Sequence, residues 1–135
     1  LGVWGRPDRC PYVIAVSGVL EEYLGTDATT LFKQASSLSD QNELIGLVRD
    51  AGFSDIHLRA ETKIARHPSL PELLPAYFSI FPVAREIAAM QEKNRARMFQ
   101  EIATALAPYC ENDGLAVPTE NYIVTAEKPS VRLSE

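Results

Sequence analysis

The chain has 135 residues, a length that suits one domain with a sizeable core. Its formal net charge is −5, and its apolar and charged fractions are those of an ordinary soluble globular protein. The basic residues between Arg49 and Arg97 are interleaved with acids, which argues against a nucleic-acid partner. No apolar run approaches the roughly 18–20 residues that span a bilayer, and we do not expect the first residues to act as a signal peptide.

The cysteines and histidines do not form a recognisable reactive or metal site. Cys10 and Cys110 lie far apart in the sequence and have no metal-ligand spacing. Free thiols in a reducing cytoplasm are therefore expected, with a single disulfide left open as the alternative. His57 and His67 have no partners at catalytic or ligand spacing, so the sequence indicates no metal site and no nameable catalytic residue.

The N-terminal part predicts a short strand followed by helices. Residues 1–5 are short, apolar and β-compatible. Pro11 suits the first position of a helix, whose apolar residues keep helical spacing up to a stop at Gly25. That helix is apolar around much of its girth, so we expect it to be covered on more than one side or to lie in an interface. A less clearly defined short helix follows, with Asp27 as its cap and residues 31–33 inside it.

The central part contains the clearest helix of the chain. Ser39 is expected to cap it, with Asp40 and Glu43 in the first turn. Its apolar face ends at Ala51, and Gly52 supplies the left-handed residue that stops it.

A strand is then predicted from Ile56 to Arg66, because apolar and polar residues alternate with a period of two. The expected buried face consists of Ile56, Leu58, Ala60, Thr62 and Ile64, and the expected wet face of His57, Arg59, Glu61, Lys63 and Ala65.

The C-terminal part predicts a helical cap, a long helix and a last strand. Ser69 caps a short helix with the aromatic and aliphatic face Leu73, Leu74, Tyr77, Phe78 and Phe81. Pro82 interrupts it, a second short helix follows, and a long helix covers residues 92–109. After a turn at 112–114, the last strand runs over residues 119–127 and the tail 129–135 frays. The order β-α-(α)-α-β-α-α-α-β predicts one α/β domain over residues 1–128, with a helical cap at about 69–92.

The order of several segments along the chain resembles that in a known protein family. The apolar-Trp-Gly ending of residues 3–7 is followed by the capped helix with Ala-Gly-Phe at 51–53, then by the strand 56–66. Next come the insertion and the helix, turn and strand of residues 106–126. In this order they resemble the C-terminal, substrate-side part of class I S-adenosylmethionine-dependent methyltransferases of the small-molecule type. The resemblance implies a small sheet of about three strands, the fifth, seventh and sixth of the Rossmann-like methyltransferase sheet.

The cofactor half of that family is missing from the chain. Its members hold S-adenosylmethionine with an E/D-x-G-x-G-x-G loop, and no glycines here have that spacing. The resemblance therefore implies that S-adenosylmethionine serves the parent enzyme, that this chain has no cofactor site, and that it is inactive alone. Because Leu1 is not a methionine, we expect it to mark a segment boundary, a proteolytic cut or disorder upstream.

The resemblance also suggests a substrate pocket. Ligands of open α/β sheets bind beyond the carboxyl ends of strands, and the candidate pocket residues are Trp4, Arg6, Tyr12, Tyr77, Phe78 and Phe81. A pocket with this lining favours a small apolar or aromatic substrate. The alternative is that these side chains are plain core.

The truncated sheet also suggests a partner. It leaves the outer edge of its first strand unpaired, which invites a homodimer through that edge. Two further interpretations stay open: a stand-alone small-ligand-binding or dimerisation module, and one subunit of a split methyltransferase.

Overall fold

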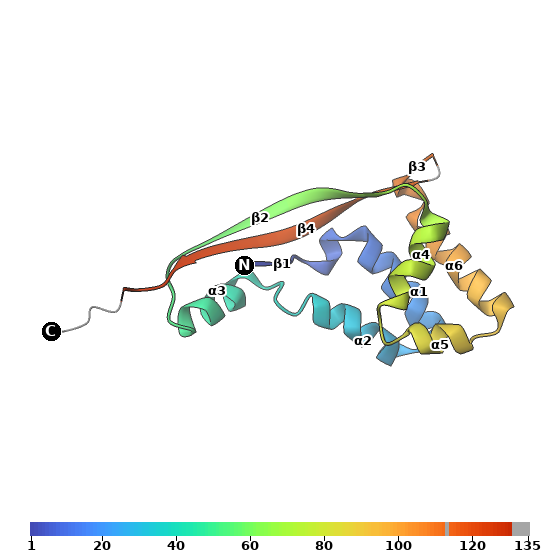
Figure 1. The fold of residues 1–135 in the computed structure, drawn as a ribbon, viewed down its shortest axis with the longest axis horizontal. Coiled ribbons are helices and arrows are strands. Elements are labelled where there is room, and N and C mark those ends of the chain that lie inside the picture. Colours follow the sequence, from blue (N-terminus) through green and yellow to red (C-terminus); the bar gives the residue numbers. More distant parts are fainter. Residues whose placement is uncertain (113, 131–135) are drawn as a thin grey trace.

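A computed structural model describes residues 1–112 and 114–130, without the side chains of residues 31–33. This part of the chain has six α-helices and a small antiparallel sheet, so the predicted α/β fold is confirmed (Figure 1). The strands are β1 (Gly2–Trp4), β2 (Ser54–His67), β3 (Cys110–Glu111) and β4 (Gly114–Glu127). The helices are α1 (Pro11–Leu24), α2 (Thr26–Ala35), α3 (Gln41–Asp50), α4 (Leu70–Ser79), α5 (Ala84–Ala89) and α6 (Glu92–Leu106). Short 3-10 helices cover Pro7–Arg9 and Ala107–Tyr109.

A long antiparallel ribbon of β2 and β4 is the axis of the sheet. The two strands have 14 residues each and pair from Ser54 opposite Glu127 to His67 opposite Leu115. β1 pairs antiparallel with the other side of β4, which gives the order β1-β4-β2. β1 and β2 therefore run parallel to each other, with the antiparallel β4 between them.

The sheet differs from the prediction in two places. β3, which pairs with the start of β4, was not predicted, because two residues are too few to show a periodicity. β4 begins at Gly114 and not at Thr119, so Pro118 lies inside it. A proline is tolerated there because β1 pairs only with residues 121–123, which leaves β2 as the partner of β4 at Pro118.

Helix boundaries follow the sequence closely, with small corrections. The cap of α3 is Asp40 and not Ser39: the backbone N–H of Glu43 donates to Asp40 Oδ1 at 3.0 Å. The long helix α6 ends at Leu106 because the chain tightens into a 3-10 turn at Pro108. The tail predicted to fray over 129–135 lies largely outside the described residues, and Pro129 and Ser130 have no regular structure.

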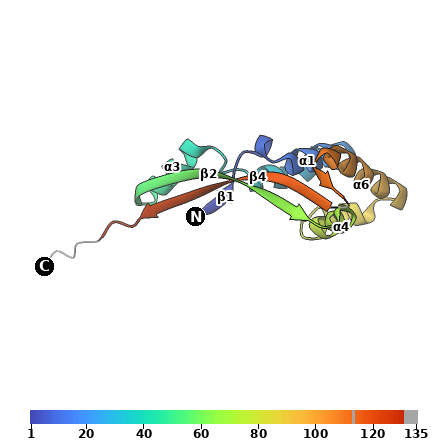
Figure 2. The ribbon, with the colours of Figure 1, turned by 90° about the horizontal axis from the view of Figure 1, so that it is seen from above.

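Two apolar clusters cover opposite faces of the ribbon at opposite ends. The larger one joins α1, α4, α5 and α6 to Leu115 and Val117 at the start of β4. The smaller one joins Leu44 of α3 to Tyr122 and Val124 near the end of β4. Side chains alternate between faces along a strand, so 115 and 117 point away from 122 and 124. The right-handed twist of the ribbon, which makes β2 and β4 cross in Figure 2, turns both faces towards the helices of Figure 1.

This arrangement corrects the predicted faces of β2. Ile56 and Leu58 are partly buried beside α3, as predicted, but Ala60, Thr62 and Ile64 are exposed, Ile64 by 51%. At that end of the ribbon the helices pack on Leu115 and Val117 of β4, which share a face with Ala65 and not with Ile64, although Ala65 itself stays exposed. The predicted alternation of side chains along β2 is correct. The prediction that one face is buried along the whole strand is wrong, because the helices pack on different faces of the ribbon at its two ends.

We predict that Gly114→Ala destabilises the protein by about 1–3 kcal/mol, the usual cost of overpacking. A Cβ at this position would lie 2.6 Å from the carbonyl oxygen of His67 and 3.1 Å from that of Pro68. Both are backbone atoms, so the β2–β4 ribbon itself would have to move. The midpoint of urea unfolding measures the effect.

Gly46→Ala is the matched control. Nothing lies within 4 Å of a Cβ at Gly46, and the residue is inside α3. We expect it to stabilise the protein by about 0.5–1 kcal/mol, because alanine loses less backbone entropy in a helix. Equal midpoints for Gly114→Ala and the unmodified chain would contradict the close approach at the ribbon end.

Candidate functional site

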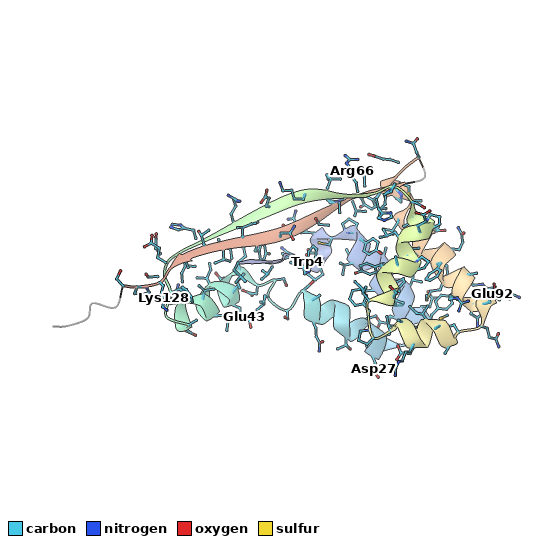
Figure 3. The ribbon with its side chains drawn as sticks, viewed as in Figure 1. Trp4, Asp27, Glu43, Arg66, Glu92 and Lys128 are labelled. Atoms are coloured by element: carbon cyan, nitrogen blue, oxygen red, sulfur yellow. The ribbon has the colours of Figure 1, made fainter. Side chains whose placement is uncertain are left out.

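A cavity of about 420 Å³ lies between the ribbon and the cap helix α4. From the sheet it is lined by Trp4, Ala65 and Thr119, which the pairing register places on one face. Figure 3 shows Trp4 beneath the ribbon, on the side where the helices lie. The remaining lining comes from α1, α2, α4 and the residues around them: Cys10, Tyr12, Val13, Ala35, Ser36, Leu73, Tyr77, Ile80 and Phe81.

The start of α4 determines which of its side chains reach the cavity. Ser69 caps this helix, as predicted, and its Oγ accepts the backbone N–H of Glu72 at 3.4 Å. From there Leu73 and Tyr77 lie four residues apart on one face of α4, and Phe81 follows just after the helix ends. The helix is thus aligned with an aromatic and aliphatic row towards the sheet.

Aromatic contacts fix the geometry of the cavity wall. The rings of Tyr12 and Tyr77 meet edge to face, with centroids 5.0 Å apart and an interplanar angle of 79°. The ring of Phe81 is tilted by 52° against that of Tyr77, with centroids 4.9 Å apart. Tyr77 is therefore the central ring, held between α1 and the end of α4.

Four of the six predicted pocket residues line this cavity: Trp4, Tyr12, Tyr77 and Phe81. Phe78 does not, because it points into the main core, is 2% exposed and stacks on Phe99 with centroids 6.0 Å apart. Arg6 does not either. Its Nη2 lies 2.6 Å from Asp8 Oδ2, and its backbone N–H donates to Glu120 Oε1 at 3.1 Å. It borders a separate polar depression at the start of α3.

Sequence reasoning missed the rest of the lining, although two signals were present. Leu73 and Ile80 share the helix face of Tyr77, so helical spacing alone would have included them. Ala65 is the single small apolar residue on the predicted wet face of its strand, and it lines the cavity although it stays exposed. Ala35, Ser36 and Thr119 come from segments whose positions depend on tertiary packing and carry no local signal.

The cavity is uncharged among the described residues. None of its lining side chains is an acid, a lysine, an arginine or a histidine. Burial raises the pKa of the Tyr12 hydroxyl far above its ordinary value and raises the pKa of Tyr77 to about 12. Both phenols are therefore neutral at physiological pH. Such a site suits binding of an apolar molecule and offers no evident acid–base pair.

One polar atom of this region is unsatisfied. The hydroxyl of Tyr12 is buried and has no hydrogen-bond partner among the described residues. The other tyrosine of α1 differs, since the hydroxyl of Tyr23 donates to Glu101 Oε1 at 2.8 Å. A buried hydroxyl without a partner is uncommon in folded proteins and requires a reason.

Outside the cavity, the histidines and cysteines are not brought together into a shared site. Within the described residues, no group of His, Cys, Asp and Glu side chains is arranged to hold a metal ion. His57 Nε2 lies 2.9 Å from Asp55 Oδ1 on the surface, and His67 Nδ1 lies 2.9 Å from the carbonyl oxygen of Ser69. Cys10 and Cys110 are free thiols.

Comparison with known proteins adds no identification. No protein-family model matches the chain, and no curated protein matches it. A search of the described helices for one long and apolar enough to cross a membrane also finds none.

We predict that Tyr12→Phe stabilises the protein by about 1 kcal/mol, because it removes a buried hydroxyl that has no partner. Thermal unfolding at neutral pH measures the change. Tyr23→Phe is the matched control, since the same substitution on the same helix removes a formed hydrogen bond and should cost about 0.5–1.5 kcal/mol. If both variants are destabilised equally, the Tyr12 hydroxyl is satisfied in solution.

Proposed function

We propose that this chain is the C-terminal, substrate-side part of an S-adenosylmethionine-dependent methyltransferase, and that its cavity holds a small apolar or aromatic substrate. The observation that carries the proposal is the uncharged cavity between Trp4 and the aromatic face of α4. A concave, mostly apolar site with a few polar groups is the usual form of a small-molecule site. It lies where α/β sheets bind ligands, since Trp4 is the last residue of β1.

The topology of the sheet supports the same proposal. The order β1-β4-β2, with an antiparallel middle strand, agrees with the fifth, seventh and sixth strands that the resemblance implies. The helical segment between β2 and α6 covers the cavity, in the position of the predicted cap. Unrelated α/β proteins can share such a topology, so it supports the proposal without carrying it.

The described residues do not fit S-adenosylmethionine itself. The cavity lining offers no carboxylate for the ribose hydroxyls and no cluster of glycines for close backbone approach. We therefore assign no methyl-transfer step to this chain. In the proposal, it supplies the substrate site, and the cofactor site belongs to another segment or another chain, as in a split enzyme.

A stand-alone small-ligand-binding module is the second candidate function. It is favoured by the lining of the cavity, to which several strands and helices of this chain contribute described side chains. It shares the ligand class of the first candidate and differs only in having no cofactor-binding partner.

A homodimer in the cytoplasm is part of the proposal as well. Among the described residues, β1 pairs only with β4, so its outer edge has no neighbouring strand. An unpaired edge is a template for another strand. In the proposal, either a second copy or the cofactor-binding half occupies it.

The ligand site is tested by filling the cavity. The chain has one tryptophan, so its indole N–H gives a single nuclear magnetic resonance signal at the cavity wall. We predict that neutral bicyclic aromatics such as 2-naphthol and 2-methylnaphthalene shift this signal in a saturable way. Ala65→Phe should weaken that binding at least tenfold, because the new ring occupies the cavity beside Thr119.

Ala60→Phe is the matched control. It makes the same change on the same strand, but five residues away and therefore on the opposite face. Binding should be as in the unmodified chain. If none of the neutral aromatics shifts the indole signal, or if both variants bind equally well, the cavity is not a ligand site and the proposal fails.

The cofactor part of the proposal has its own measurement. Calorimetric titration of the chain with S-adenosylmethionine and with S-adenosylhomocysteine should give no binding heat at millimolar ligand. The reason is that no described residue set fits either molecule. Stoichiometric binding would overturn the assignment of the cofactor to another segment, and titration with 2-naphthol shows in the same sample that the protein is folded.

A further inference from the structure

Tyr12 lines the cavity, and its buried hydroxyl has no hydrogen-bond partner among the described residues. The residue as a whole is 9% exposed. Its ring is held edge to face against Tyr77, with centroids 5.0 Å apart. This contact holds the Tyr12 ring in place beside the cavity.

Other polar groups of the wall do not satisfy it. The Thr119 hydroxyl donates to the carbonyl oxygen of Lys63 at 3.2 Å, which commits its proton to the sheet. Core packing alone does not call for a hydroxyl at position 12, since phenylalanine has the same ring. What distinguishes tyrosine here is one unpartnered hydroxyl on a side chain that lines an apolar cavity.

We propose that the Tyr12 hydroxyl is the polar anchor of the cavity and donates a hydrogen bond to an oxygen atom of the bound molecule. The ligand class is then a neutral aromatic molecule with one acceptor oxygen, such as a phenol. This inference rests on the proposed function, because it names the substrate class of the same cavity.

Charge and protonation agree with this class. Burial raises the pKa of Tyr12, so the phenol keeps its proton and acts as a donor at physiological pH. No described lining side chain carries a charge that would compensate an anion, so a carboxylate would be buried unpaired. An uncharged oxygen is the partner that fits both facts.

A pair of near-isosteric probes tests the anchor. 2-Naphthol and 2-methylnaphthalene differ by a hydroxyl in place of a methyl group. We expect the unmodified chain to bind 2-naphthol roughly five- to tenfold more tightly, the preference that one neutral hydrogen bond provides. Tyr12→Phe should remove this preference and leave the affinity for 2-methylnaphthalene unchanged. The indole N–H signal of Trp4 measures both affinities.

Two controls keep the result specific. Tyr23→Phe also removes a hydroxyl from α1, but one that is bonded to Glu101 outside the cavity lining, so the preference should persist. 2-Naphthoate, which has the same rings and a negative charge, should bind at least tenfold more weakly than 2-naphthol.

The outcomes separate this inference from the proposed function. If both neutral probes bind but Tyr12→Phe keeps the preference for 2-naphthol, the anchor is wrong and the cavity remains a ligand site. Tighter binding of 2-naphthoate overturns the neutral ligand class. If neither neutral probe binds the unmodified chain, the proposed function fails and the anchor fails with it.

Discussion

The long pairing of β2 with β4 is the constraint on which the rest of the structure depends. A two-stranded ribbon is marginally stable in water by itself, so it has to be covered by other elements. β1 widens it only opposite residues 121–123 of β4. Stability must therefore come from the helices, which bury Leu115 and Val117 at one end and Tyr122 and Val124 at the other.

The cavity exists because the helices bury the two ends of the ribbon on different faces. Between the two clusters the covering elements change from one face of the ribbon to the other, and a short stretch of sheet near Thr119 belongs to neither. On the side of the larger cluster this stretch is bordered by Trp4, which remains 53% exposed, and by the small side chain of Ala65. Helix α4 reaches over it with aromatic side chains. The space is left by the geometry of the ribbon, and its wall combines buried side chains such as Tyr12 with exposed ones such as Trp4.

The parts of the fold that sequence predicted are those with local causes. The cap at Ser69, the stop at Gly25 and the aromatic row through Tyr77 each depend on residues within one or two turns, and the structure contains them. The switch of faces along β2 depends on helices that are distant in sequence, so strict alternation predicted a single buried face and placed Ile64 wrongly.

The same distinction applies to the site. Tyr77, Phe78 and Phe81 were predicted as one aromatic face, and the resemblance added Tyr12 as a further pocket residue. In the structure Phe78 leaves that face and stacks on Phe99 instead. Arg6 was assigned to the pocket for its place after β1. Its guanidinium, however, pairs with Asp8 two residues later, and this local ion pair turns it away. The ion pair with Asp8 thus sets the position of the Arg6 side chain, which the resemblance did not predict.

Tyr12 has a ring whose position the core explains and a hydroxyl that the core does not explain. Its ring contributes to the core as helical spacing predicts, and phenylalanine would do this equally well. Its hydroxyl is the one buried side-chain polar atom of the described residues that lacks a partner, in a protein where the hydroxyl of Tyr23 on the same helix has one. Because an unpaired buried hydroxyl lowers stability, its presence at the cavity wall is better explained by what enters the cavity than by the fold.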